Sequence, residues 1–417
     1  MNSNNPLENR IVNALKNIEE KTNNFPKTNE INLFENYLDS IFFNLEYSNY
    51  LKNQKKLNEF QKHFDEYFQT FTISVQNREI AVNLYGMSGL LLACNILYKN
   101  NCLTNVKYSQ SKDFTELLLK VAIEQQKRNN YDLFSGSVGN IMVAVSLIEK
   151  HEIVEYENSF IDYFKVLEKT AISDKNSNGL KWYSLHPIYK TEIYNLGLSH
   201  GFISIVAVLC KIAEKFTDNV QLQTKCKDLL QKITSFVLSN EINFEKHNSF
   251  FPMYSLDSFE NKIYSSRLAW CYGDLGIAIT LLRAAKVLND KLLNEKAVKI
   301  LIKNTERKDY KINNIFDLWF CHGTSGIAYM FKKSYELTKN ELFKETTEFW
   351  ISETLNMLEY EDYFEYTLKK NPTANKNNYS SKNSLSLITG YSGIGLVLCS
   401  FLYPDFNNSW DEIFLLS

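Results

Sequence analysis

The sequence lacks long hydrophobic runs and any excess of charge of one sign. Its 417 residues include 46 lysines and arginines against 48 acidic residues, a net charge of -2. This balance provides no basic surface for phosphates and excludes nucleic acid as the main partner. The best apolar runs, 198–210 and 394–403, are too short to cross a bilayer, and the first ten residues do not resemble a signal peptide. We therefore expect a cytoplasmic protein without a transmembrane segment.

Cysteine, proline and arginine are also scarce. Seven cysteines are spread singly along the chain, which excludes a disulfide framework and leaves them as thiols, metal ligands or core residues. Only six prolines interrupt the chain, and apolar residues recur at helical spacing through most of it. With 44% hydrophobic residues, the chain can bury roughly three quarters of its unfolded surface. These features predict a large, mainly α-helical globular protein.

A short glycine theme occurs six times, and each copy is followed by about ten apolar and small residues. The first glycines are 50 to 72 residues apart, which is long enough for a pair of helices with loops. Amphipathic stretches lie between the themes, as expected for helices that cover buried ones. The copies are Tyr85–Gly89, Ser135–Gly139, His200–Ser204, Tyr272–Gly276, His322–Gly326 and Thr389–Gly393.

This repeat predicts an all-α fold of the α/α toroid class, a ring of helical hairpins in which a buried inner helix begins at each glycine theme. We expect one domain over residues 1–417. The segment 1–71 has a helical pattern without the theme and is a candidate for a further hairpin. Residues 173–194 and 244–266 look less helical and are expected to be small, β-containing inserts at the rim.

Alignment of the themes brings reactive side chains into register. Cys271 and Cys321 both stand two residues before their glycine, and His200 and His322 both stand one residue before theirs. If the inner helices run in the same direction, all four residues meet at one mouth of the ring. Two thiolates and one imidazole, from Cys271, Cys321 and His322, form a typical zinc site with a fourth position open, as in catalytic zinc enzymes.

The other cysteines fit ordinary structural roles. Cys94, Cys210 and Cys399 fall at equivalent depths in the inner helices and are expected in the core. His200 is a candidate acid or base, because a free imidazole with a pKa of about 6.5 can carry a proton near neutral pH. Asp132 and Arg267 stand shortly before theme glycines, and by themselves they are typical of solvated or ion-paired residues.

The sequence resembles the lanthionine synthetase C family, the LanC-type cyclases of class I lanthipeptide biosynthesis. The resemblance rests on Leu198-Ser-His-Gly201, Trp270-Cys-Tyr-Gly273 and Cys321-His-Gly-Thr-Ser-Gly326, which occur in the family's order. It implies an α/α toroid and a Zn²⁺ cofactor bound by Cys271, Cys321 and His322. Two positions depart from the family pattern: Ser204 replaces a second glycine, and Asp274-Leu275 stands where proline is common.

The resemblance also implies the reaction. A lanthionine synthetase adds a cysteine thiol of a dehydrated precursor peptide to dehydroalanine or dehydrobutyrine, which closes a thioether ring. His200 matches the family's acid/base histidine, and Asp132, Arg267 and Tyr272 match residues that orient the site or lie beside the metal. The implied partners are the precursor peptide, a cognate dehydratase and an ABC exporter. The implied location is the cytoplasm, at the membrane only through such a complex.

Three alternatives remain open. The first, which also follows from the resemblance, is the addition of glutathione to dehydroamino acids in proteins. The second is a non-catalytic scaffold that binds a peptide and in which zinc is a structural staple. The third is glycoside hydrolysis, which needs two carboxylates at the mouth; only Asp132 is a plausible one, Asp274 is a weak second, and a zinc trio would be superfluous.

Overall fold

The computed structural model of the chain describes residues 5–24, 33–34, 36–76, 81–103, 112–185, 191–258, 264–375 and 384–417. Its chain divides into two compact units. The first comprises Met1–Ala81, Tyr85–Tyr108 and Lys308–Trp410, and the second comprises Val82–Leu84, Ser109–Arg307 and Asp411–Ser417. The expectation of one domain over residues 1–417 stays a prediction.

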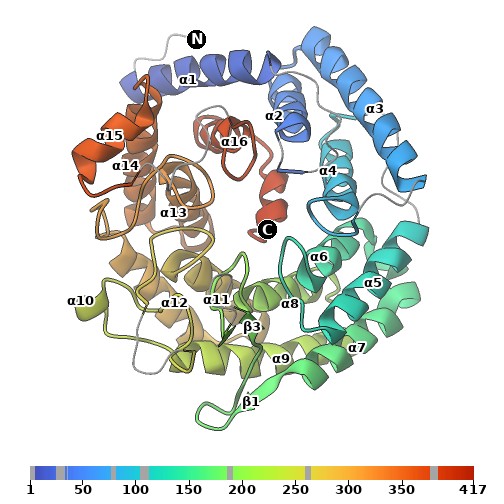
Figure 1. Cartoon of the computed structure of the whole chain (residues 1–417). Coiled ribbons are helices and arrows are strands. Elements are labelled where there is room, and N and C mark those ends of the chain that lie inside the picture. Colours follow the sequence, from blue (N-terminus) through green and yellow to red (C-terminus); the bar gives the residue numbers. More distant parts are fainter. Residues whose placement is uncertain are drawn as a thin grey trace. The chain divides into compact units, whose positions relative to one another are not determined.

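In the first unit, helices buried along most of their length alternate with amphipathic ones. The buried helices are α2 (Tyr37–Tyr50), α4 (Met87–Lys99), α13 (Thr324–Thr338) and α16 (Tyr391–Leu402). The others are α1 (Pro6–Asn23), α3 (Gln54–Gln76), α14 (Glu341–Leu358) and α15 (Tyr363–Lys370). As Figure 1 shows, α14 packs along α13 and α3 packs along α2. The apolar stripe of each amphipathic helix therefore closes over a buried helix.

The second unit repeats this arrangement with three buried helices, α6 (Ser137–Leu147), α8 (Ile203–Lys215) and α11 (Asp274–Leu288). α8 contacts both α6 and α11, and amphipathic helices pack against these three. The amphipathic helices are α5 (Lys112–Lys127), α7 (Ile153–Thr170), α9 (Val220–Ser239) and α12 (Lys291–Asn304). The short helices are η2 (Lys150–Glu152) and α10 (Phe244–His247), and η4 (Ser409–Phe414) lies near the last residues.

The glycine themes begin buried helices, as predicted. Glycine is the residue at the N-terminal cap of α4, α6, α11, α13 and α16. At Gly273 the backbone has φ +101°, a conformation that L side chains rarely adopt. At Gly326 a Cβ atom would lie 1.8 Å from the carbonyl oxygen of Phe320. The theme thus permits a turn in which the chain folds back tightly on itself.

The third theme differs. Here α8 begins at Ile203, two residues after Gly201, and Ser204 replaces the second glycine found in the other themes. The Ser204 hydroxyl donates a hydrogen bond of 2.7 Å to the carbonyl oxygen of Gly201, which satisfies an acceptor at the start of the helix. The departure from the family pattern therefore changes the helix start without removing the turn.

α2 is a buried helix without the glycine theme, in the segment where a further hairpin was predicted. Its first turn is held by Asp39, which is fully buried and accepts hydrogen bonds from the backbone N–H groups of Asn36 and Leu387. Burial raises the pKa of Asp39 to about 7. A carboxylate here replaces the close backbone packing that glycine provides elsewhere.

The expected insert at 173–194 contains the only strands among the described residues. β1 (Ile172–Asp174) pairs antiparallel with β2 (Gly179–Lys181), and β3 (Ser184–Leu185) pairs with β4 (Glu192–Ile193). The insert at 244–266 contains α10; an isolated bridge from Asn195 to Tyr254 joins it to its surroundings, and a second bridge, from Pro252 to Ser265, lies within it. Parts of both inserts, residues 186–190 and 259–263, lie outside the described residues.

Candidate active site and metal centre

The turn before each buried helix positions the candidate residues. Cys271 and Tyr272 precede α11, and Cys321 and His322 precede α13. The backbone N–H of Cys321 donates to the carbonyl oxygen of Ile388 at 2.9 Å, and the carbonyl oxygen of Cys271 accepts from Leu198 at 2.9 Å. Both cysteines are therefore held by their own backbone as well as by packing.

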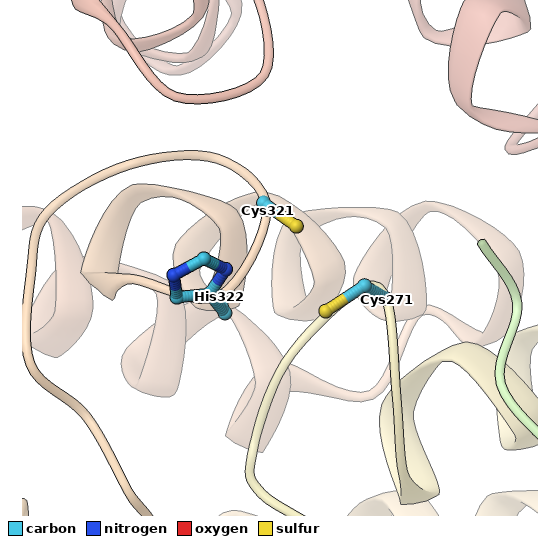
Figure 2. Close-up of side chains that lie close together, drawn as sticks. All are labelled: Cys271, Cys321 and His322. Carbon is cyan, nitrogen blue, oxygen red and sulfur yellow. The ribbon is translucent and has the colours of Figure 1, made fainter. Parts of the chain in front are cut away.

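Cys271, Cys321 and His322 offer two sulfur atoms and one imidazole nitrogen that all lie within 4.8 Å of one another. Figure 2 shows these three side chains around one space. Cys271 is buried, whereas Cys321 and His322 are partly exposed. This donor set suits zinc, because thiolates and imidazole are its preferred ligands and three protein ligands leave one position open. The structure therefore brings together the predicted trio, and the residues fit a zinc ion.

A buried carboxylate that the sequence analysis missed lies behind His322. Asp317 Oδ2 lies 3.1 Å from His322 Nε2, and the Asp317 side chain is only 1% exposed. Asp317 stands six residues before Gly323, the same register that Arg267 has before Gly273. That shared register was the available signal, but only the folded loop shows that the carboxylate turns toward the histidine.

His200 and Asp132 form a second carboxylate–histidine pair. Asp132 Oδ2 lies 2.5 Å from His200 Nδ1, and Asp132 Oδ1 accepts hydrogen bonds of 2.8 Å from the backbone N–H groups of Phe134 and Ser135. Burial acts to lower the pKa of His200, but the hydrogen bond and charge of Asp132 outweigh it and raise that pKa. Burial likewise acts to raise the pKa of Asp132, but the hydrogen bond and charge of His200 lower it. The pair thus favours a cationic imidazole whose Nε2 is directed away from Asp132.

Tyr272 borders the same pair. Its ring centroid lies 6.3 Å from that of His200, and its hydroxyl accepts a hydrogen bond of 3.1 Å from the side-chain amide of Asn195. Burial raises the pKa of Tyr272, so the phenol stays protonated. His200, Asp132 and Tyr272 line a pocket of about 290 Å³. The remaining lining residues are Asn129, Asn130, Tyr131, Ser184, Leu185, Ile193 and Asn195.

The structure places the other candidates differently. Arg267 is half-buried in the loop before α11, and its carbonyl oxygen would lie 2.4 Å from a Cβ at Gly273. Asp274, proposed above as a second mouth carboxylate, is fully buried. It accepts hydrogen bonds from the backbone of Phe250 and Phe251 and pairs with Arg307 at 3.2 Å. A carboxylate enclosed in this way cannot reach a sugar, so glycoside hydrolysis loses even this weak second acid.

The predicted core cysteines are confirmed. Cys94, Cys210 and Cys399 are fully buried, and burial raises the pKa of each thiol. Cys102 and Cys226 are also buried, with raised pKa values. Among the cysteines, which all lie in the described part of the chain, only Cys271 and Cys321 approach a histidine to form a potential metal site.

Comparison with protein families decides the identity of the chain. Residues 40–415 match the model of the lanthionine synthetase C-like proteins. The chain belongs to the lanthionine synthetase C-like family. Among individual proteins, it is 24% identical over 390 residues to the nisin biosynthesis protein NisC of Lactococcus lactis subsp. lactis, which covers 88% of this chain and 85% of that protein.

The LanC-like assignment agrees with the fold. A solved structure named nisin cyclase superposes with a TM-score of 0.67 at 20% identity and covers 98% of this chain and 97% of that one. The predicted all-α fold of the α/α toroid class with small β inserts is confirmed. The expected enzyme class, a lanthionine synthetase of the lanthipeptide cyclase type, is confirmed by the family. No helix within the described ranges is both long enough and apolar enough to cross a membrane.

Proposed function

We propose that this LanC-like protein is a zinc-dependent cyclase that closes thioether rings in a dehydrated precursor peptide. The single observation that carries the zinc dependence is the convergence of Cys271, Cys321 and His322 within 4.8 Å. The peptide substrate is proposed by analogy with the relatives named for nisin biosynthesis and nisin cyclisation. A zinc ion at the trio would lower the pKa of a substrate thiol, which in free cysteine is about 8.5, and so supply a thiolate at neutral pH.

His200 is the proton donor in this proposal. When the substrate thiolate forms a bond to the β-carbon of a dehydroamino acid, the electron pair of the double bond moves toward the carbonyl group, and the α-carbon must then take up a proton. Nε2 of the cationic His200 gives that proton, and Asp132 favours the cation through Nδ1. The proton taken from the thiol and the proton given to the α-carbon balance, so ring closure needs no oxidant or reductant.

The pocket of about 290 Å³ beside His200 is the proposed place of the dehydroamino acid. Its lining includes asparagines and Tyr272, whose polar groups are of the kind that pairs with peptide groups, and the apolar Leu185 and Ile193. The role of Arg267 stays a prediction. The complex with a dehydratase and an exporter also stays a prediction.

The proposal is tested with four proteins, the wild type and the variants Cys321→Ala, His200→Asn and Cys399→Ala. Zinc is measured by elemental mass spectrometry. Ring closure is measured on a dehydrated peptide by counting the thiols left for alkylation. We expect Cys321→Ala to lose both zinc and ring closure, and His200→Asn to keep zinc and lose ring closure. Cys399→Ala makes the same chemical change at a buried cysteine outside the trio and should keep both.

Three results would contradict the proposal. A fully active, metal-loaded Cys321→Ala protein would overturn the ligand assignment. A wild type that couples glutathione to a cysteine-free dehydrated peptide, but does not close rings in a peptide with its own cysteine, would favour glutathione addition. A zinc-loaded wild type that does neither would leave the scaffold alternative.

A further inference from the structure

We infer that Asp317 is a positioning residue that fixes the tautomer of His322 and thereby turns Nδ1 toward the metal. This inference rests on the proposed zinc site. It concerns residues 317–323, which form one loop before α13. Nothing in the sequence motifs assigns a role to Asp317.

The loop holds the Asp317 carboxylate in one orientation. Asp317 Oδ1 accepts a hydrogen bond of 3.0 Å from the backbone N–H of Trp319. The backbone carbonyl oxygen of Asp317 accepts one of 3.1 Å from the backbone N–H of Thr324. At Gly323 a Cβ atom would lie 2.3 Å from Asp317 Oδ1. The theme glycine is thus required for the carboxylate to fit against the turn.

The second carboxylate oxygen needs a donor. Asp317 Oδ2 is buried and has no hydrogen-bonded partner among the described residues, while His322 Nε2 lies 3.1 Å away. A buried carboxylate oxygen without a donor is costly, so the arrangement favours a proton on Nε2. Neutral imidazole carries one proton, and its lone pair is then on Nδ1. The nitrogen available to a metal is therefore Nδ1.

The second pair in the protein has the opposite orientation. Asp132 contacts Nδ1 of His200, which leaves Nε2 for the substrate. Asp317 contacts Nε2 of His322, which leaves Nδ1 for the metal. The two aspartate–histidine pairs thus perform different tasks. The ring nitrogen that the carboxylate contacts decides which nitrogen is left for the substrate or the metal.

Asp317→Asn tests the inference sharply. The amide oxygen can still accept from Trp319, so the amide NH₂ group takes the place of Oδ2 and presents a donor to Nε2. The favoured tautomer then has its proton on Nδ1, where the metal should bind. We expect the affinity for zinc to fall about 10- to 100-fold, as is typical when such a partner is lost. The affinity is measured by competition with a coloured chelator.

Asp132→Asn is the matched control, since it makes the same change in the other pair and should leave zinc affinity unchanged. The tautomer is read independently of the metal. The ¹⁵N spectra are recorded on the metal-free protein at a pH well above the usual histidine pKa of about 6.5. The protein has six histidines, and the signal of His322 is assigned as the one that is lost in His322→Gln. We expect the proton on Nε2 in the wild type and on Nδ1 in Asp317→Asn.

The outcomes separate this inference from the proposed function. If the wild type binds zinc and Asp317→Asn binds it equally well, the inference is overturned and the function stands. If the wild type binds no zinc but His322 carries its proton on Nε2, the tautomer assignment stands and the zinc-dependent function fails. A wild-type His322 with its proton on Nδ1 overturns the inference, even if Asp317→Asn does not fold.

Discussion

Asp132→Asn should shift the pH dependence of ring closure. The wild-type Asp132 raises the pKa of His200 through a contact of 2.5 Å and through its charge. A group whose pKa is raised in the folded protein keeps its proton to higher pH, so the acid is present below the raised pKa and is lost above it. The variant keeps the backbone hydrogen bonds of Phe134 and Ser135 to the remaining oxygen. It removes only the charge and the acceptor that face His200.

The magnitude follows from the exposure of the pair. A hydrogen bond between charged groups contributes about 1.5–3 kcal/mol. The His200 side chain is 45% exposed, so solvent screening places this pair at the lower end of that range. About 1.4 kcal/mol corresponds to a factor of ten in the fraction of cationic His200. Ring closure at alkaline pH should therefore be about tenfold slower in Asp132→Asn, and the rates should converge at acid pH.

The assay is the pH–rate profile for a peptide with one cysteine and one dehydroalanine, at saturating zinc. Asp132 and Cys271 are the titratable groups that act on His200, and Tyr131 and Tyr272 line the same pocket; only Asp132 is changed. The zinc content of the variant serves as the control and should equal that of the wild type. An alkaline limb at the same pH in both proteins would refute the reasoning, because His200 would then titrate independently of Asp132.

Two further predictions concern the thiols and the buried ion pair. Five cysteines are buried with raised pKa values, so mild alkylation of the folded, metal-free protein should modify only Cys321 and then Cys271. Zinc should protect both. The modified thiols are counted from the intact mass, and a third one before unfolding would contradict the prediction. Asp274→Asn leaves the Arg307 charge buried without its partner and should lower the free energy of unfolding by about 3 kcal/mol in denaturant titrations. The exposed pair of Lys232 and Asp228 supplies the control, since Asp228→Asn should lower it by less than about 1 kcal/mol.

The sequence predicted the buried helices well because their starts depend on a local requirement. A turn in which the chain contacts its own backbone excludes side chains, so glycine marks it regardless of the surroundings. The helix α2 was predicted only as part of an unspecified hairpin. Its start depends on Asp39, which accepts from Leu387, nearly 350 residues away in the sequence. No local pattern contains that contact.

The candidate site also combines features that local spacing predicts with features that depend on the folded surroundings. The register of Cys271 and Cys321 followed from their shared distance to a theme glycine, and that of His322 from the distance it shares with His200. Asp317 was missed, and Asp274 was named only as a weak second acid for the mouth, because both are acidic residues near a theme and differ only in what surrounds them. One faces a histidine, and the other is enclosed by backbone N–H groups and Arg307. The partners of a carboxylate are decided by packing, which spacing alone does not report.

At each theme glycine, a residue that the fold requires stands directly after a residue that is available for function. Each of the six glycines is buried, whereas the residue immediately before it is exposed or partly exposed: Tyr85, Ser135, His200, Tyr272, His322 and Thr389. A substitution at such a position changes a reactive group without disturbing the packing of the helix that follows. The repeated turn therefore provides a set of equivalent positions, directly before the theme glycines, at which functional side chains can be exchanged. New activities can arise in this fold through single substitutions at these positions while the hydrophobic core is inherited unchanged.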